Sequence, residues 1–327
     1  MDIKTRVLME LKSADSYVSG QDICERCNVS RTAVWKIING LKAEGYEIDS
    51  VTNKGYRIIK APDILSKSEI ESVMAEGSIV NRVIYFDETD STNTRAKLLG
   101  EEGVADGTLV VADCQNSGKG RRGKSFSSPN GQSVYMTFLL RPDISPAKAA
   151  MITILSAMAV RGALSEVCQI DTNIKWPNDV VADGKKICGI LTEMSAELTR
   201  VNYVAVGIGI NVNNEKMPKD IENVAVSARM LTGKVYSRSL IIGSVCRWFS
   251  DYYRKFISTL SLSPIKEEYN RYLINMNKEV EIVRDNESYR AKSLGIDDDG
   301  RLLVERNGKT ETVLSGEVSV RGVYGYV

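Results

Sequence analysis

The sequence predicts an α+β protein made of three parts, and three observations support this. The chain has 327 residues, which is more than one hydrophobic core usually organises. Residues 1–62 carry short helix patterns followed by a hairpin pattern, and residues 63–272 mix strands and hairpin signals with long helical stretches. Residues 273–327 contain short strand patterns separated by turn residues. Strands and helices mixed in this way favour α+β over a doubly wound sheet.

The composition is that of a soluble globular protein, and it excludes several kinds of chemistry. Apolar residues make up 43% of the chain and charged residues 26%, while the 43 basic side chains nearly cancel the 42 acidic ones. No overall charge therefore indicates a nucleic-acid or membrane partner, and any basic surface is local. The absence of histidine excludes Ser-His-Asp hydrolysis, Cys-His proteolysis and histidine-ligated metals. Acid–base work falls to Lys, Asp, Glu, Tyr or water.

The chain is expected to be cytoplasmic. Its N-terminus alternates charge and lacks the long apolar core of a secretory signal. The longest apolar run, residues 149–160, is too short to span a bilayer. Six scattered cysteines fit a reducing compartment better than a disulfide framework. Cys24 and Cys27 form a CxxC pair, but no second pair or histidine completes a zinc site, which disfavours redox or metal use.

Two helices and a hairpin are expected near the N-terminus. Ser19 and Asp22 resemble a capping arrangement that starts a short helix. A second helix is expected to start near Ser30, because apolar residues follow at i, i+3, i+4 and i+7. These residues are Val34, Ile37, Ile38 and Leu41. Residues 46–51 and 56–59 are predicted to form two strands. Two helices followed by a hairpin form the winged helix-turn-helix pattern, whose second helix enters the major groove of DNA.

Four side chains supply DNA-contacting groups at the positions where such a domain needs them. They are Arg31, Thr32 and Lys36 on the second helix and Lys54 in the wing. They predict a DNA-binding domain. Two alternatives remain open, namely a small helical domain used for protein contacts and a relic that no longer binds DNA.

The middle and last parts follow a linker at Pro62, which ends the second wing strand. The central part is expected to contain strands over residues 108–112, 134–140 and 203–211, and a helix from Pro146 to about Cys168. The last part is expected to contain strands over residues 279–284, 289–294, 302–306 and 310–314. Short strands without a helix signal predict a small all-β barrel.

A glycine-rich basic loop is the first candidate for chemistry. Residues 118–123 match GxGxxG, but the dinucleotide fingerprint needs a helix to open within the motif, and here loop residues follow. The backbone amides and the charges of Lys119, Arg121 and Arg122 predict a flexible loop that wraps a phosphate or adenylate. A solvated basic turn explains these residues equally well.

A hairpin lysine is the second candidate. Residues 175–179 are Lys-Trp-Pro-Asn-Asp, and a turn at Asp183 and Gly184 predicts a hairpin with Lys186 on its second strand. A lysine fixed on a sheet can clamp a carboxylate as it attacks an α-phosphate, and can stabilise the charge that develops there. An exposed hairpin lysine without a role is the alternative.

Five motifs in this order resemble those of bacterial biotin–protein ligases. They are residues 90–93, Gln115 with the loop 118–123, residues 175–179 with Lys186, residues 207–211 and residues 315–322. Together with the N-terminal winged helix they resemble the bifunctional ligase/repressor class over essentially the whole chain. The resemblance implies a central class II synthetase-like ligase domain over residues 63–272 and a C-terminal SH3-like barrel over residues 273–327.

The resemblance also implies a two-step reaction. Biotin and Mg-ATP give enzyme-bound biotinyl-5′-adenylate and pyrophosphate, and a lysine of a biotin carboxyl carrier domain then attacks the mixed anhydride. ATP and Mg²⁺ are the implied cofactors, and no protein metal site is assigned. The class is expected to bind operator DNA as a homodimer when adenylate is bound, and to have no membrane partner.

Residue roles carry over from the resemblance position by position. The biotin-binding set is Ser91, Thr92, Asn93, Gln115, Gly118, Lys119, Gly120, Arg121, Lys186 and Gly189. The set that binds ATP or adenylate is Lys119, Arg121, Arg122, Phe126, Lys175, Asn178, Asn211 and Arg321. The catalytic set is Lys186, Arg121 and Asp179. Lys186 is expected to contact the biotin carboxylate and the α-phosphate, and Asp179 to orient the acceptor amine.

Two positions depart from the family pattern. Arginine is common where Lys119 stands, and lysine lacks the planar guanidinium fork, so the loop is expected to order less firmly over adenylate. Tryptophan is common where Phe126 stands, and a phenyl ring still stacks on adenine. A ligase for another acid, such as lipoate, and a ligand-sensing repressor without catalysis are the alternative functions.

Overall fold

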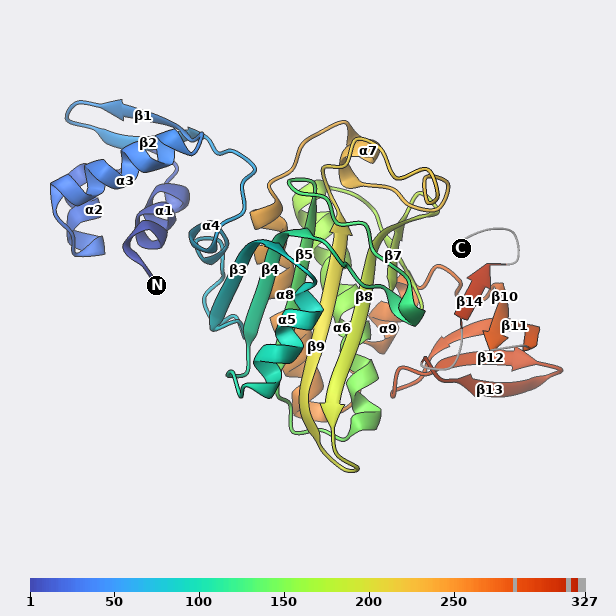
Figure 1. Ribbon diagram of the computed structural model, residues 1–327. Coiled ribbons are helices and arrows are strands. Elements are labelled where there is room, and N and C mark those ends of the chain that lie inside the picture. The colour runs from blue at the N-terminus through green and yellow to red at the C-terminus, as the bar shows by residue number, and fades with distance from the viewer. Residues whose placement is uncertain (285–286, 316–318, 323–327) are drawn as a thin grey trace.

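The N-terminal part is a small helical body with a hairpin, followed along the chain by a large central sheet and a smaller C-terminal sheet (Figure 1). The structure is a computed structural model that describes residues 1–284, 287–315 and 319–322, without the side chains of residues 284, 287 and 319–322. The α+β class and the three-part order agree with the expectation from the sequence.

The N-terminal body has the winged helix-turn-helix arrangement. Its elements are α1 (Ile3–Ser13), α2 (Gly20–Cys27), α3 (Arg31–Ala43), β1 (Glu47–Val51) and β2 (Gly55–Lys60). The side chains of Ser19 and Ser30 accept hydrogen bonds from the backbone N–H groups of Asp22 and Ala33, which caps α2 and α3 as expected. Val34, Ile38 and Leu41 of α3 are buried in the core of this body, which also contains Cys27 of the CxxC pair.

A short helix, α4 (Lys67–Glu71), joins this body to the central part, and no pattern in the sequence predicts it. Its residue Glu69 is only 2% exposed. The Glu69 carboxylate accepts hydrogen bonds from Lys12 at 2.5 Å, from the Tyr46 hydroxyl and from the Ser239 hydroxyl at 3.0 Å. The carboxylate therefore ties the N-terminal body to the central one.

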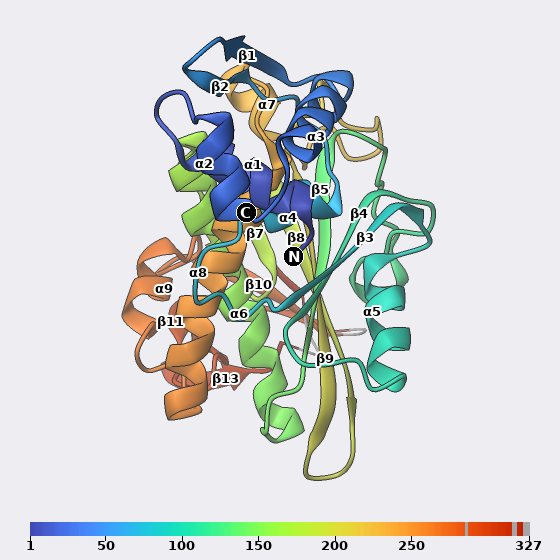
Figure 2. The same ribbon diagram turned by 90° about the vertical axis from the view of Figure 1, so that its left-hand side faces the viewer.

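The central sheet has the strand order β3-β4-β5-β9-β8-β7-β6, with β3 and β4 parallel and all other neighbours antiparallel. The strands are β3 (Arg82–Thr89), β4 (Thr108–Gln115), β5 (Ser133–Leu140), β6 (Asn173–Lys175), β7 (Asp179–Ala182), β8 (Lys185–Ala196) and β9 (Val201–Asn211). Helix α5 (Thr92–Glu101) covers one face, and α6 (Pro146–Ala163) and α8 (Arg238–Thr259) cover the other (Figure 2). Two further helices are α7 (Ala228–Thr232) and α9 (Lys266–Tyr272).

Helix α6 is the central helix of the core. It starts with Pro146 in its first turn and continues through a π-helical turn, Leu164–Cys168, so the expected span is confirmed. By length and composition the stretch Pro146–Cys168 would cross a membrane, but 78% of its most apolar window is buried inside the protein. Its apolar surface is therefore accounted for by the sheet and α8.

The C-terminal body is an antiparallel sheet with the order β13-β12-β11-β10-β14. Its strands are β10 (Glu279–Arg284), β11 (Glu287–Ile296), β12 (Leu302–Arg306), β13 (Lys309–Val313) and β14 (Ser319–Gly322). The first four were expected and β14 was not. The indole N–H of Trp176 donates to the carbonyl oxygen of Gly300 at 3.0 Å, which fixes this sheet against the central part.

Candidate active site

Two cavities of the central body share one wall. The larger has a volume of about 1260 Å³ and the narrower about 50 Å³. Both are lined by Gly120, Arg121, Phe126, Asn178 and Lys186. A small molecule held in the narrow cavity therefore has one end at the mouth of the large cavity.

Glycines of β8 and β9 create the narrow cavity. Ile208 and Ile210 of β9 belong to the buried core that includes α6, so the alternating residues Gly207 and Gly209 lie on the opposite face of the sheet. Gly189 of β8 is the cross-strand partner of Gly209. A Cβ at Gly209 would lie 2.7 Å from the Phe126 ring, and one at Gly207 would lie 1.9 Å from Asn93 Oδ1. Side chains larger than hydrogen would therefore fill this space.

Polar groups at the start of α5 line the same cavity. Gln115 Oε1 accepts from the backbone N–H of Thr92 at 2.8 Å and from its hydroxyl at 3.2 Å. The Thr137 hydroxyl lies 2.8 Å from both Thr92 Oγ1 and Asn93 Oδ1. Ser91 occupies the N-cap position of α5 but its side chain makes no capping hydrogen bond. The hydroxyl of Ser91 is thus not committed to the helix, whereas Thr92, Asn93 and Gln115 support one another.

The basic loop folds back on itself above this cavity. The Phe126 N–H donates to the Gly118 carbonyl at 2.9 Å, and the Gly120 N–H donates to the Lys124 carbonyl at 2.7 Å. The loop contains a short 3-10 turn, Arg121–Gly123, and no α-helix, so the rejection of a dinucleotide fingerprint is supported. A Cβ at Gly118 would lie 2.3 Å from the Phe126 carbonyl oxygen. Gly118 therefore allows the loop to close and does not line either cavity.

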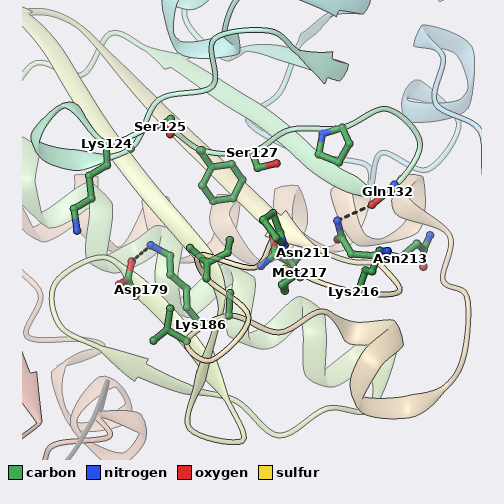
Figure 3. Close-up of a pocket in the computed structure, with 18 of the residues that line it drawn as sticks. Lys124, Ser125, Ser127, Gln132, Asp179, Lys186, Asn211, Asn213, Lys216 and Met217 are labelled. Atoms are coloured by element: carbon green, nitrogen blue, oxygen red, sulfur yellow. Dashed lines mark hydrogen bonds and ion pairs between the residues drawn. The ribbon is translucent and has the colours of Figure 1, made fainter.

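Lys186 lies at the junction of the two cavities, paired with Asp179 at 2.7 Å from Nζ to Oδ1 (Figure 3). The expected hairpin turn is present, because Asp183 and Gly184 both have positive φ values, 47° and 71°. The Lys186 N–H also donates to the Val224 carbonyl at 2.8 Å. Sheet and loop thus fix the backbone of Lys186, and Asp179 orients its ammonium group.

Arg121 joins three parts of the chain at this junction. Its guanidinium donates to Asn178 Oδ1 at 2.8 Å and to the Ser315 carbonyl of the C-terminal body at 2.6 Å. Burial lowers the pKa of Arg121, and the nearby Asp179 carboxylate opposes that shift. The guanidinium of Arg121 therefore lies in a site from which much of the water is excluded, with a carboxylate nearby.

The large cavity combines apolar, amide and cationic groups. Met217, Ile221 and Val224 contribute apolar surface, and Asn211, whose amide donates to the Val226 carbonyl at 3.2 Å, contributes an amide group (Figure 3). Lys175, which is 7% exposed, and Arg122 also line this cavity. Such a lining suits a flat heteroaromatic ring with an attached phosphate chain.

The structure brings most of the predicted residues together. Every residue predicted to bind biotin except Gly118 lines the narrow cavity. Of the predicted nucleotide set, Arg121, Arg122, Phe126, Lys175, Asn178 and Asn211 line the large cavity, whereas Lys119 lines the narrow one. Arg321 belongs to β14, but its side chain lies outside the described residues. The predicted DNA-contacting residues lie apart from both cavities, in α3 and in the turn between β1 and β2.

Sequence reasoning missed several lining residues. Gly207 and Gly209 belong to one of the five motifs, but they are not in the set predicted to bind biotin. Their alternation with isoleucine indicates a strand with one apolar face and one face without side chains, which is a signal for a cavity. Asp63 and most residues of the segment 213–225 also line the large cavity. Nothing local in these segments marks them, because distant contacts bring them to the site.

Comparison with known proteins agrees with this geometry. Residues 85–213 match the Biotin/lipoate A/B protein ligase family, residues 4–57 an HTH domain, and residues 276–321 the Biotin protein ligase C terminal domain. Bifunctional ligase/repressor BirA of Bacillus subtilis is 39% identical over 96% of this chain and 97% of that protein. The chain belongs to the bifunctional ligase/repressor BirA family. The BirA of Escherichia coli is 25% identical over 96% of both chains.

A solved structure supports the same assignment to the BirA family. The biotin protein ligase of Aquifex aeolicus in complex with biotin and ATP superposes with a TM-score of 0.65 and 31% identity. The match covers 74% of this chain and 99% of that one. The family expected from the motifs is therefore confirmed.

Replacing Gly207 with alanine is expected to destabilise the protein by about 1–3 kcal/mol. The new methyl would lie 1.9 Å from Asn93 Oδ1, and Asn93 is held by Thr137 and by the Leu191 carbonyl, so it cannot move aside freely. Urea unfolding measures the change. Gly40→Ala is the control, since a Cβ there meets nothing within 4 Å. Equal midpoints for Gly207→Ala and wild type would contradict the packing argument.

Proposed function

We propose that this chain activates biotin with ATP and transfers it to a lysine of a biotin carboxyl carrier domain, and that it also represses transcription in response to biotin. The ligase part of the proposal rests on the wall shared by the two cavities. A carboxylate of biotin bound in the narrow cavity and a phosphate of ATP bound in the large cavity would meet at this wall. The relatives in the BirA family support both parts.

In the first step a carboxylate oxygen of biotin attacks the α-phosphorus of ATP, and the bond from that phosphorus to the bridging oxygen of pyrophosphate breaks. Negative charge collects on the α-phosphate oxygens and on the leaving group. Lys186 and Arg121 are fixed cations on the shared wall, so they stabilise this charge without having to reorganise. Biotinyl-5′-adenylate and pyrophosphate result.

In the second step the amine of the carrier lysine attacks the acyl carbon of the adenylate, and AMP leaves. The amine must lose a proton, which passes to Asp179, to water or to the phosphate of the leaving AMP, since the chain has no histidine. Asp179 lines the large cavity and lies 2.7 Å from Lys186, so its carboxylate is placed to orient the entering amine.

Replacing Asp179 with asparagine is expected to slow biotin transfer from preformed adenylate by about 10²-fold, because an amide neither accepts a proton nor attracts an ammonium group. Single-turnover transfer to a purified carrier domain measures the rate. Asp183→Asn is the matched control in the same hairpin, since asparagine tolerates the positive φ of this turn residue. Transfer by Asp179→Asn at the wild-type rate would show that Asp179 has no part in this step.

The site fits a Mg²⁺ ion that arrives with ATP. The described residues contain no cluster of three or more Asp, Glu, Cys or His side chains that could hold a metal alone. Mg²⁺ commonly uses one or two carboxylates with substrate phosphate oxygens and water, and the large cavity offers the carboxylates of Asp179, which also pairs with Lys186, and of Glu215. When bound, the ion would neutralise phosphate charge.

The regulatory part of the proposal rests on the N-terminal body. Helix α3 presents Arg31, Thr32 and Lys36 to solvent, and Lys54 lies in the wing. We propose a cytoplasmic protein whose adenylate-bound form dimerises on operator DNA, because paired recognition helices match a two-fold site. The functional units are residues 1–62, 63–272 and 273–327.

Biotin-dependent exchange of pyrophosphate into ATP tests the enzyme. Exchange with biotin and little exchange with lipoate is expected from the purified full chain. Exchange that occurs with lipoate and not with biotin would show that lipoate is the substrate. Biotin-dependent binding to DNA without any exchange would leave a sensing repressor and remove the ligase function.

A further inference from the structure

Helix α3 carries a large aromatic residue that the fold does not use. Trp35 is 58% exposed, whereas Val34, Ile38 and Leu41 of the same helix are buried. Trp35 is not part of the core of the N-terminal body, and within the described part of the chain its indole forms no hydrogen bond or ring contact. Tryptophan is also a poorer helix former than alanine or lysine. The stability of the free domain therefore does not explain this residue.

The neighbours of Trp35 on this face are polar. Thr32, Lys36 and Asn39 are exposed, and positions 32, 35, 36 and 39 follow the i, i+3, i+4 and i+7 spacing of one helix face. Arg31 precedes this stripe, and its guanidinium donates to Gln21 of α2 at 3.0 Å. The indole is thus an apolar group among polar and cationic side chains.

An exposed indole beside cationic side chains favours DNA over an apolar protein surface as the partner. An apolar protein face would leave the charges of Arg31 and Lys36 without compensation, whereas DNA phosphates compensate them. The major groove presents mostly polar base edges, and its apolar group is the C5-methyl of thymine. An exposed indole on a helix that enters the groove can pack against that methyl group.

We propose that Trp35 determines specificity by packing against a thymine methyl at one position of each operator half-site. The proposal rests on the proposed repressor function and adds to it the chemical feature that the helix reads. Lys36 and Arg31 supply phosphate and base contacts beside the indole, and Trp35 supplies the discrimination for thymine.

The test uses the full chain with biotin and ATP. Duplexes are selected from a randomised pool by the wild type, and affinities are measured for the best duplex and for copies in which single thymines are replaced by deoxyuridine, which lacks only the methyl group. Replacing this thymine in one half-site is expected to weaken wild-type binding about fourfold, the factor for burying one methyl group, and replacing it in both half-sites about sixteenfold. Trp35→Ala is expected to bind the thymine duplex at least tenfold more weakly, and to be insensitive to the same replacement.

The outcomes separate this proposal from the repressor function. Failure of the wild type to select any duplex would remove the repressor function and Trp35 recognition with it. Selection followed by equal deoxyuridine effects in wild type and Trp35→Ala overturns the role of Trp35 alone. The role of Trp35 is also overturned if Trp35→Ala binds the duplex as tightly as the wild type does. It is overturned as well if sedimentation without DNA shows that Trp35→Ala differs from the wild type in self-association. Trp35→Phe is the matched control, expected to retain part of the thymine effect. Circular dichroism and urea unfolding of each variant confirm that the N-terminal body is folded, and pyrophosphate exchange confirms that the central site is intact.

Discussion

Replacing Lys186 with alanine is expected to lower biotin-dependent pyrophosphate exchange by about 10²- to 10³-fold, the range for removing one fixed group that stabilises transition-state charge. Lys186 lies where the two cavities meet, and its ammonium is oriented by Asp179. The loss is expected mainly in the maximal rate, because the charge that Lys186 stabilises develops during phosphoryl transfer. Exchange kinetics over a range of biotin and ATP concentrations measure it.

Lys185→Ala is the matched control for this variant. Lys185 precedes Lys186 on β8, but its ammonium donates to the Glu222 carbonyl and it lines neither cavity. Near-normal exchange by Lys185→Ala together with collapse in Lys186→Ala would assign the effect to the junction. Equal rates for both variants would mean that adenylation does not depend on Lys186.

Replacing Arg238 with methionine is expected to destabilise the protein by about 3–5 kcal/mol, because removal of one partner leaves buried charges unpaired. Arg238 is 1% exposed and lies at the start of α8. Its guanidinium contacts Asp63 at 2.8 Å and also Asp113 of β4. Both carboxylates would be left without their cation. Urea unfolding followed by circular dichroism measures the change.

Arg200→Met is the control for a surface ion pair. Arg200 and Asp143 lie 3.5 Å apart with side chains that are mostly exposed, so the loss is expected to be below about 1 kcal/mol. A similarly small loss of unfolding free energy in Arg238→Met and Arg200→Met would show that the buried ion pairs of Arg238 contribute little to stability.

Local signals in the sequence are sufficient for much of the fold. Capping residues such as Ser19 and Ser30 and the apolar spacing of α3 act within a few residues, and the structure confirms both helices. The Asp183–Gly184 turn fixes the hairpin that carries Lys186 for the same reason. Helix α4, with five residues, is too short to show a helical period, and β14 has four residues.

The missed parts of the site depend on distant contacts. Arg238 meets Asp63 across 175 positions of the chain, and Asn213 meets the same carboxylate across 150. No periodicity within a window of the sequence encodes such pairs. The role of Gly118 at the biotin site stays a prediction from the motif, and the structure adds that a Cβ there would meet the Phe126 carbonyl oxygen. The motifs therefore predict where the candidate site lies. The contacts that each side chain makes there follow only from the three-dimensional arrangement.

The paired glycines of β8 and β9 leave the sheet without side chains where Gly189 faces Gly209. One face of a sheet is normally covered continuously, and here α5 and the basic loop cover it only in part. A ligand in the narrow cavity would therefore take the place of the missing side chains and complete the packing of the protein interior. The same contacts would then stabilise the complex and the fold, and the free energy of unfolding would rise with the logarithm of the ligand concentration above the dissociation constant.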